Sequence, residues 1–133
     1  MAIFDAGLVH APVTPFTRAG RVDFDACGKL IEFHLRNGAD ALALPMHAGE
    51  SVSLTESERR ALIEFAIKQV RGRVPVVAHV SDAGSGIAAE YARHAEAATF
   101  ARATAASALV KASCSLPTPG LSPGLPTSFR ASE

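Results

Sequence analysis

Apolar residues between positions 8 and 98 alternate between short continuous runs and runs with helical spacing. Short apolar runs at residues 8–13, 41–45 and 75–80 predict β-strands. The third run is apolar at nearly every position, which is typical of a strand that is covered on both faces. After each run, apolar residues recur every three or four positions, as they do in a helix with one buried side.

Local signals mark the ends of three predicted helices. Asp23 is a suitable N-cap for the first helix, and Gly38 suits the position after its end. Thr55 and Glu58 form a capping box at the start of the second, and the third begins at residue 85 or 86. The apolar stripes of the three helices contain Phe24, Cys27, Leu30, Ile31, His34 and Leu35; Leu62, Ile63, Ala66, Ile67 and Val70; and Ile87, Ala88, Tyr91, Ala92 and Ala95.

The alternation of strand and helix predicts an α/β fold with a parallel sheet, because the crossovers between such strands are right-handed. The spacing of the units fits a (β/α)8 TIM barrel, which needs about 250 residues. A chain of 133 residues therefore supplies the N-terminal part of such a barrel, about three of the eight βα units.

The composition changes at residue 99 and divides the chain into residues 1–98, a partial barrel, and residues 99–133, a low-complexity tail. Residues 101–107 are rich in alanine without a clear strand, and four prolines follow among serine, threonine and glycine, namely Pro117, Pro119, Pro123 and Pro126. This pattern predicts disorder. The tail is either a natural flexible extension or the product of a frameshift or gene truncation, and we favour the second interpretation.

Charge and cysteine content exclude several classes of protein. The formal net charge is zero, so nothing in the composition attracts nucleic acid or an anionic membrane surface. No apolar run approaches the roughly 20 residues of a membrane helix, and the N-terminus lacks the features of a secretory signal. A disulfide between Cys27 and Cys114 is not expected, which favours a reducing cytoplasm.

Two motifs point to a known family. Residues 44–58 read LPMHAGESVSLTESE, a strand followed by a glycine-bearing loop and a capped helix, and residues 13–16 read VTPF. In this order and spacing they resemble the dihydrodipicolinate synthase/N-acetylneuraminate lyase family, over residues 7 to 98. The resemblance implies a TIM barrel and, in the full-length enzymes, a Schiff-base (class I) aldolase or lyase that acts on pyruvate or a related 2-oxo acid. It also implies a homo-oligomer without a metal or other cofactor.

The resemblance assigns the loop after the second strand to substrate binding. In the family, two adjacent hydroxyl residues precede Gly-Glu and help to hold the carboxylate of the 2-oxo acid. Here His47 and Ala48 take their places, while Gly49 and Glu50 match. We expect all four residues to contact substrate in a complete barrel; alternatively, Gly49 only makes the turn and Glu50 only anchors the loop.

Residues near the ends of the three strands are further candidates for substrate binding. Thr14 either hydrogen-bonds the loop at 45–50 or merely ends its strand, and we favour the second reading. If His10, His47 and His79 all point inward, they converge on one site. Such a site is either a metal centre, with Asp82 or Glu50 as an added ligand, or a polar pocket for an acidic substrate, and we favour the pocket.

Other polar residues have simpler explanations. Ser81, Asp82 and Gly84 form a turn that caps the next helix. The pair Arg59-Arg60 is expected on a solvated helix face together with Glu56 and Glu58.

No catalytic residue is assigned. The resemblance implies a Schiff-base lysine on the sixth strand and a proton-shuttling tyrosine after the fourth and fifth strands. The lysines here are Lys29 and Lys68 on predicted helices and Lys111, taken as an ordinary tail residue, and the one tyrosine, Tyr91, is expected to pack on the third helix.

Three functions follow from these patterns. The favoured one is a truncated family member that is inactive alone. The alternatives are a non-catalytic assembly or binding module formed by a partial barrel with open strand edges, and, less favoured, a metal hydrolase built on the histidines.

Overall fold

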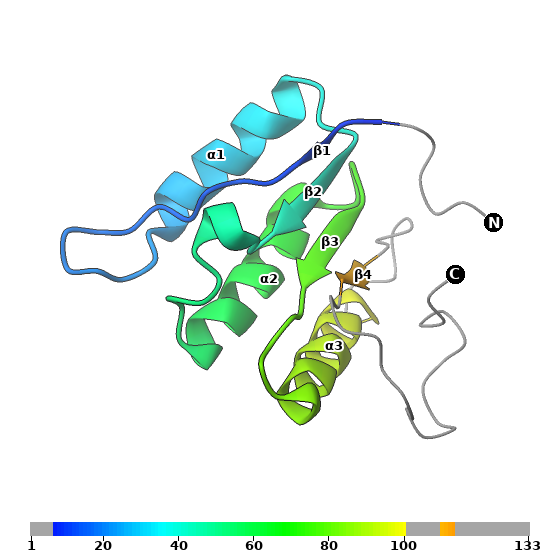
Figure 1. Ribbon diagram of the computed structural model, residues 1–133. Coiled ribbons are helices and arrows are strands. Elements are labelled where there is room, and N and C mark those ends of the chain that lie inside the picture. Colours follow the sequence, from blue (N-terminus) through cyan, green and yellow to red (C-terminus); the bar gives the residue numbers. More distant parts are fainter. Residues whose placement is uncertain (1–6, 101–109, 114–133) are drawn as a thin grey trace.

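The structure is a computed structural model that describes residues 7–100 and 110–113. Its strands are β1 (Val9–His10), β2 (Ala41–Leu44), β3 (Val76–His79) and β4 (Val110–Ser113). All three neighbouring pairs of strands are parallel, and their order in the sheet is their order in the chain (Figure 1). The helices that connect them are α1 (Phe24–Arg36), α2 (Glu56–Val70) and α3 (Ser85–Phe100), and a short 3-10 helix, η1 (His47–Gly49), follows β2.

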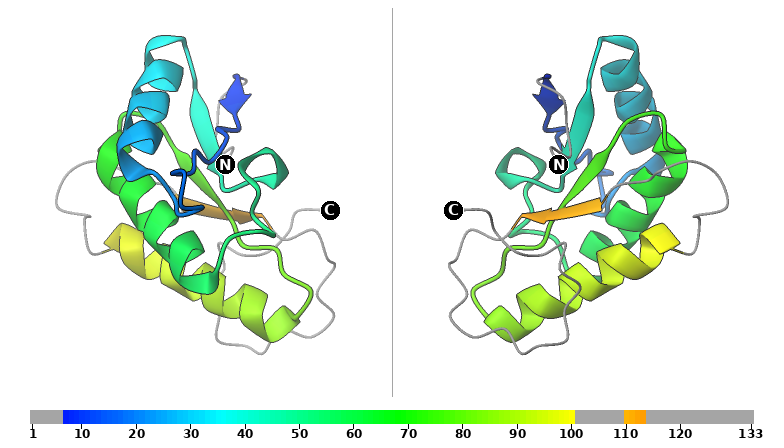
Figure 2. Two further views of the ribbon diagram at one scale, coloured as in Figure 1. Left: turned by 90° about the vertical axis from the view of Figure 1, so that its left-hand side faces the viewer. Right: turned by 90° about the vertical axis from the view of Figure 1, so that its right-hand side faces the viewer.

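The three helices cover one side of the sheet, as both views in Figure 2 show. Each helix returns the chain to the start of the next strand, which is how consecutive strands become parallel. The predicted α/β fold with a parallel sheet is confirmed.

The core lies between the sheet and the helices. On β2 and β3 the alternate residues Leu42, Leu44, Val76 and Ala78 belong to one buried cluster. The helices contribute their predicted apolar stripes to the same cluster, including Leu62, Ile63, Ala66, Ile67 and Val70 of α2 and Tyr91, Ala92 and Ala95 of α3. Because strand side chains alternate between faces, Ala43 and Val77 lie on the opposite face of the sheet.

The helix boundaries confirm the signals in the sequence. The Asp23 carboxylate accepts a hydrogen bond from the N–H of Ala26 at 3.0 Å. Thr55 and Glu58 form both hydrogen bonds of the capping box. These side chains satisfy N–H groups that have no partner within the helix.

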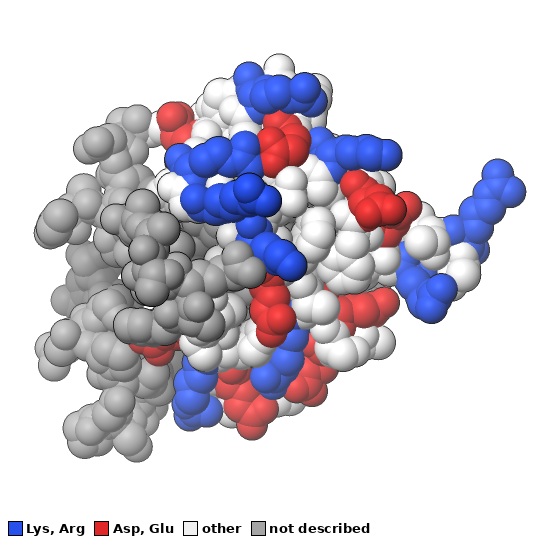
Figure 3. All heavy atoms as spheres, turned by 180° about the vertical axis from the view of Figure 1, so that it is seen from behind, with Lys and Arg blue, Asp and Glu red and all other residues white. Residues whose placement is uncertain are grey.

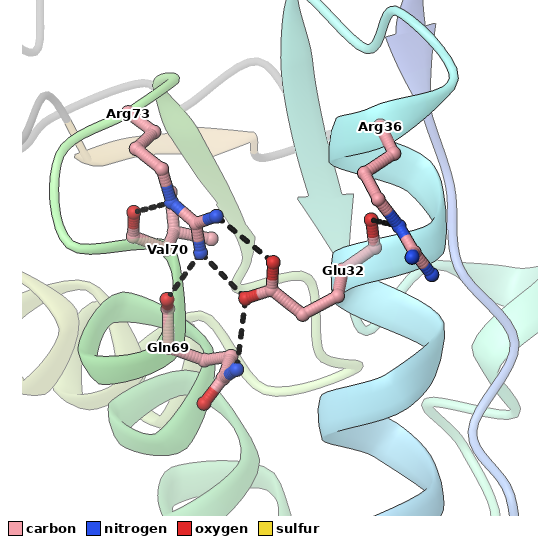
Figure 4. A network of polar contacts seen from close by, with 5 residues as sticks. All are labelled: Glu32, Arg36, Gln69, Val70 and Arg73. Atoms are coloured by element: carbon pink, nitrogen blue, oxygen red, sulfur yellow. Dashed lines mark hydrogen bonds and ion pairs between the residues drawn. The ribbon is translucent and has the colours of Figure 1, made fainter.

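A polar network joins the outer sides of α1 and α2 (Figure 4). Arg73 donates to both carboxylate oxygens of Glu32, at 2.9 and 2.6 Å, and also to the carbonyl oxygens of Gln69 and Val70. The side chain of Gln69 donates to Glu32 at 2.9 Å. These donors, Arg73 foremost, lower the pKa of Glu32 to about 2.

The face opposite to the view of Figure 1 carries intermixed basic and acidic side chains (Figure 3). This agrees with a formal net charge of zero. Within residues 7–100 and 110–113, none of the helices combines the length and the apolar character that crossing a membrane requires.

The first strand is shorter than predicted. The sequence indicates a strand over residues 8–13, but the ladder contains only Val9 and His10. Pro12 and Pro15 follow, and since proline has no N–H to donate, the ladder cannot continue through them.

A strand lies within the tail for which the sequence predicts disorder, so for residues 110–113 this prediction is wrong. Helix α3 continues to Phe100, and β4 pairs with β3 from Val76↔Val110 to His79↔Ser113. The run Leu109-Val110 is too short to stand out from its alanine-rich surroundings, and pairing with β3 supplies what local sequence lacks. The predicted disorder of the tail concerns mainly residues 101–109 and 114–133, which lie outside the described residues.

Candidate functional site

The loop after β2 lies at the carboxyl end of the sheet and is held against the segment that follows β1. The hydroxyl of Thr14 donates to the carbonyl oxygen of Gly49 at 2.7 Å, and both residues are buried. The favoured interpretation of Thr14 as a strand terminator only is therefore wrong, because its hydroxyl bonds the loop.

Gly49 is required here by the close approach of two chain segments. A Cβ atom at this position would lie 3.1 Å from the carbonyl oxygen of Pro12 and 3.2 Å from the Thr14 hydroxyl. The next residue, Glu50, has a left-handed backbone with φ 54° and is exposed. The loop thus turns tightly: Gly49 is buried, and the side chains of His47, Ala48 and Glu50 are exposed.

The backbone amides of this loop divide into two groups. The N–H groups of Gly49 and Ser51 donate to the carbonyl oxygen of Met46, and that of Glu50 donates to His47. The N–H groups of His47 and Ala48 have no acceptor among the described residues. Two backbone donors are therefore left at the carboxyl end of β2.

The structure brings His47 and His79 together. Their ring centroids are 5.4 Å apart with an interplanar angle of 62°, an edge-to-face contact. His79 is only 5% exposed, and its Nδ1 has no hydrogen-bond partner within the described part of the chain. Burial, together with the charges of Arg59 and His47, lowers the pKa of His79 from its usual value.

His10 does not join this pair, so the predicted convergence of three histidines is wrong. The Nδ1 atom of His10 lies 2.9 Å from the Nδ1 atom of His34 on α1. His10 is paired in register with Leu42, which packs on the helix side, so both face the helices. A shift of β1 by one residue relative to β2 would be needed to turn the His10 side chain to the other face of the sheet.

Arg59 is buried, and the prediction that it lies on a solvated face is wrong for this residue. It is 5% exposed, and its Nη2 atom donates to the carbonyl oxygens of His79 and Ser81, each at 3.1 Å. Its guanidinium lies 4.2 Å from the centroid of the Tyr91 ring, which confirms Tyr91 as a packing residue. The spacing 59, 62, 63, 66, 67 and 70 already places Arg59 on the buried stripe of α2, a signal that the charge of the residue concealed.

The turn after β3 is built as predicted. The carboxylate of Asp82 accepts from the N–H of Gly84 at 3.1 Å, and its other oxygen lies 3.7 Å from Nη1 of Arg59. Nowhere in the described ranges do three or more His, Cys, Asp or Glu residues gather to hold a metal ion. The geometry of the histidines therefore gives the metal-hydrolase alternative no support.

Ser51 is a residue that the sequence did not single out. It is 1% exposed, and its hydroxyl lacks a hydrogen-bond partner in the structure described here. A buried hydroxyl without a partner is costly, and such groups concentrate where a protein binds something else.

Two of the three lysines lie on helices and one lies on a strand. Lys29 and Lys68 are exposed on α1 and α2. Lys111 lies in β4, in register with Val77, and its interpretation as an ordinary lysine without a Schiff-base role stays a prediction.

Comparisons with known proteins agree with this geometry. Residues 5–110 match the model of the dihydrodipicolinate synthetase family. A 4-hydroxy-tetrahydrodipicolinate synthase of Pseudomonas putida is 45% identical over 73 residues, which are 55% of this chain and 25% of the relative.

Two solved structures extend the comparison to the fold. The dihydrodipicolinate synthase of Aquifex aeolicus matches with a TM-score of 0.67 and 40% identity, over 69% of this chain and 31% of that one. YagE of E. coli K12, a prophage protein of the same family solved in complex with pyruvate, matches with a TM-score of 0.70 and 32% identity, over 74% and 33% of the two chains. The chain thus spans between a quarter and a third of the length of these relatives, as the N-terminal part of their barrel. The chain belongs to the dihydrodipicolinate synthetase family.

Proposed function

We propose that this chain provides the first βα units and the carboxylate-binding loop of a barrel that acts on 2-oxo acids, and that alone it has no Schiff-base activity. The observation that carries the proposal is the loop at residues 47–50, bonded through Gly49 to Thr14 at the carboxyl end of the sheet. In α/β barrels, ligands bind at this end, above the strands.

The loop has the donors that a carboxylate needs. The N–H groups of His47 and Ala48 have no acceptor within the described chain, and the imidazole of His47 is exposed beside them. Backbone donors bind a carboxylate without the entropic cost of fixing a side chain. Pyruvate is the ligand of the related YagE structure, which supports a 2-oxo acid as the ligand.

The expected absence of Schiff-base chemistry rests on the positions of Lys29 and Lys68 and of the one tyrosine, and the trapping experiment tests it for Lys111. Lys29 and Lys68 are exposed on α1 and α2, in the helix layer, whereas the loop follows the carboxyl end of β2. A Schiff base needs an amine within bonding reach of the 2-oxo carbon and a group to move the proton. Tyr91, the one tyrosine of the chain, is buried under Arg59 and does not face such a site.

Borohydride trapping tests the expected absence of Schiff-base activity, and a pyruvate-binding measurement tests the role of the loop. The purified chain is incubated with pyruvate and borohydride, and its mass is compared with that of a sample without pyruvate. We expect no adduct, together with saturable binding of pyruvate that Thr14→Val weakens by releasing the loop. A stable adduct, above all on Lys111, would contradict the inactivity, and the absence of any pyruvate binding would contradict the role of the loop.

A second candidate, an assembly module, is favoured by the edge of the sheet. Val9 of β1 and the flanking residues Leu8 and Val13 are 48%, 58% and 56% exposed. Exposed apolar residues on a strand edge promote pairing with another chain, here a second copy. Light scattering distinguishes the candidates, because assembly predicts a defined oligomer that Val9→Lys converts to a monomer.

A cytoplasmic location is also part of the proposal. Cys27 is a free buried thiol, and burial raises its pKa to about 11. Such a thiol is protonated and inert at neutral pH. Labelling with a thiol reagent before and after unfolding checks this state, since Cys27 should react only after unfolding.

A further inference from the structure

The contact between His47 and His79 joins two separate βα units at the carboxyl end of the sheet. His47 comes from η1 after β2, and His79 is the last residue of β3. Their rings meet edge to face at 5.4 Å, so the position of one ring limits the orientation of the other. Neither ring contacts a carboxylate among the described residues, whereas His94 on α3 bonds Glu64 at 2.7 Å.

The two imidazoles differ in burial and in charge. His79 is 5% exposed, and burial, followed by Arg59 and His47, lowers its pKa below the ordinary value of 6.5. It is therefore uncharged at neutral pH, and its buried Nδ1 has no partner in the described chain. His47 is exposed and is the ring of the pair that a ligand can reach.

A buried cation lies beside the pair. The guanidinium of Arg59 bonds the carbonyl oxygens of His79 and Ser81, each at 3.1 Å. The nearest carboxylate that the structure describes for this group, that of Asp82, lies 3.7 Å from Arg59 and also bonds Gly84. Asp82 therefore pairs with Arg59, whereas neither histidine ring has a carboxylate partner among the described residues, which leaves the pair open to an anionic group of a ligand.

We propose that His47 and His79 recognise a second acidic group on the substrate, so that the preferred ligands are 2-oxo dicarboxylic acids. The inference rests on the proposed function, in which the loop amides take the first carboxylate. His47 donates a charge-assisted hydrogen bond to the second carboxylate. His79 is a positioning residue, which holds the ring of His47 through their edge-to-face contact.

Calorimetry with matched ligands tests this assignment on the full chain. 2-Oxoglutarate and 2-oxopentanoate have equal carbon chains, but only the former has a second carboxylate, and pyruvate reports on the loop alone. We expect 2-oxoglutarate to bind about tenfold more tightly than 2-oxopentanoate, the gain of one charge-assisted hydrogen bond. His47→Ala should reduce this ratio to near one, and His47→Lys, which supplies a charged donor at this position, should restore a ratio well above one.

His94→Ala is the matched control, since it removes an imidazole that bonds Glu64 on the helix side. It should leave the ratio unchanged. His47 is exposed, so its variants test the pair without unfolding the core, and the Hε1 resonance of His47 should shift with 2-oxoglutarate but not with 2-oxopentanoate.

Each failure has its own signature. Equal binding of the two five-carbon acids, in a chain that binds pyruvate, overturns the role of the histidine pair and leaves the proposed function intact. Binding of none of the three acids overturns both. A ratio that persists in His47→Ala also overturns the assignment, because the second carboxylate must then be bound elsewhere.

Discussion

Replacement of Arg59 by methionine tests how much a single buried guanidinium contributes to the carboxyl end of β3. The Arg59→Met variant keeps an apolar stem of similar length but leaves the carbonyl oxygens of His79 and Ser81 without the donor that lies 3.1 Å from each. It also removes the cation that lies 4.2 Å from the centre of the Tyr91 ring. The end of β3 and the turn after it thus lose the side-chain hydrogen bonds that Arg59 of α2 donates to them.

The expected loss follows from opposing terms. Two hydrogen bonds from a charged donor contribute about 1.5–3 kcal/mol each, and the ring contact adds about 1 kcal/mol. Against this, methionine needs no desolvation of a charge, and the buried Nε of Arg59, which lacks a partner in the described chain, disappears with it. We expect a net fall in the free energy of unfolding of about 3 kcal/mol, a large part of the roughly 5–15 kcal/mol that is typical of a domain.

Urea denaturation followed by circular dichroism measures this loss, and Arg60→Met provides the control. Arg60 is the next residue of α2 and makes ion pairs with Glu56 and Glu90 on the surface, at 2.6 and 3.7 Å. Such pairs contribute at most about 1 kcal/mol. Equal destabilisation by the two substitutions would refute the reasoning, because burial and the two carbonyl partners would then have no measurable weight.

Three further predictions concern the loop, the histidines and the helix network. Gly49→Ala should lower the thermal unfolding midpoint, because the added Cβ would lie 3.1 Å from the carbonyl oxygen of Pro12. Gly86→Ala is the control: its Cβ would have no neighbouring atom within 4 Å, so the midpoint should stay unchanged or rise. Burial lowers the pKa of His34 below 6.5, so the contribution of the neutral ring to stability is complete above pH 6.5 and is lost as the pH falls through the folded-state pKa. The urea midpoint should therefore be lower at pH 5.5 than at pH 7.5, and this difference should be smaller in His34→Gln. The pKa of Glu32, about 2, should return toward 4.5 in Arg73→Gln, as measured by NMR titration, and the stability from this carboxylate, complete above pH 4.5, is lost as the pH falls through about 2. A Glu32 pKa that stays near 2 in the variant would show that Arg73 is not its cause.

The parts of the fold that the sequence predicted are those that depend on local chemistry. The N-cap Asp23 and the capping box of Thr55 and Glu58 bond atoms three residues away, so their geometry is set within a single turn. The apolar stripe of α2 likewise repeats over many residues and leaves one face to bury. Each signal is complete within its own segment.

The parts that escaped prediction depend on partners distant in sequence. His10 faces the helices because β1 pairs with β2 in one register, and a shift by one residue would reverse its face. Arg59 is buried because carbonyl oxygens of residues 20 and 22 positions later lie above α2. Residues 110–113 form a strand because β3 offers a free edge.

The order of the strands has a consequence for how the chain acquires its fold. Each described strand pairs only with strands that are next to it in the chain, from β1 to β4. A unit that has left the ribosome therefore needs only its predecessor in order to dock, and no strand waits for a distant segment still to be synthesised. Growth of the sheet proceeds in one direction, with nearest-neighbour interactions like those of a repeat protein. At each boundary between units, the part already made therefore has every sheet partner that precedes it in the chain.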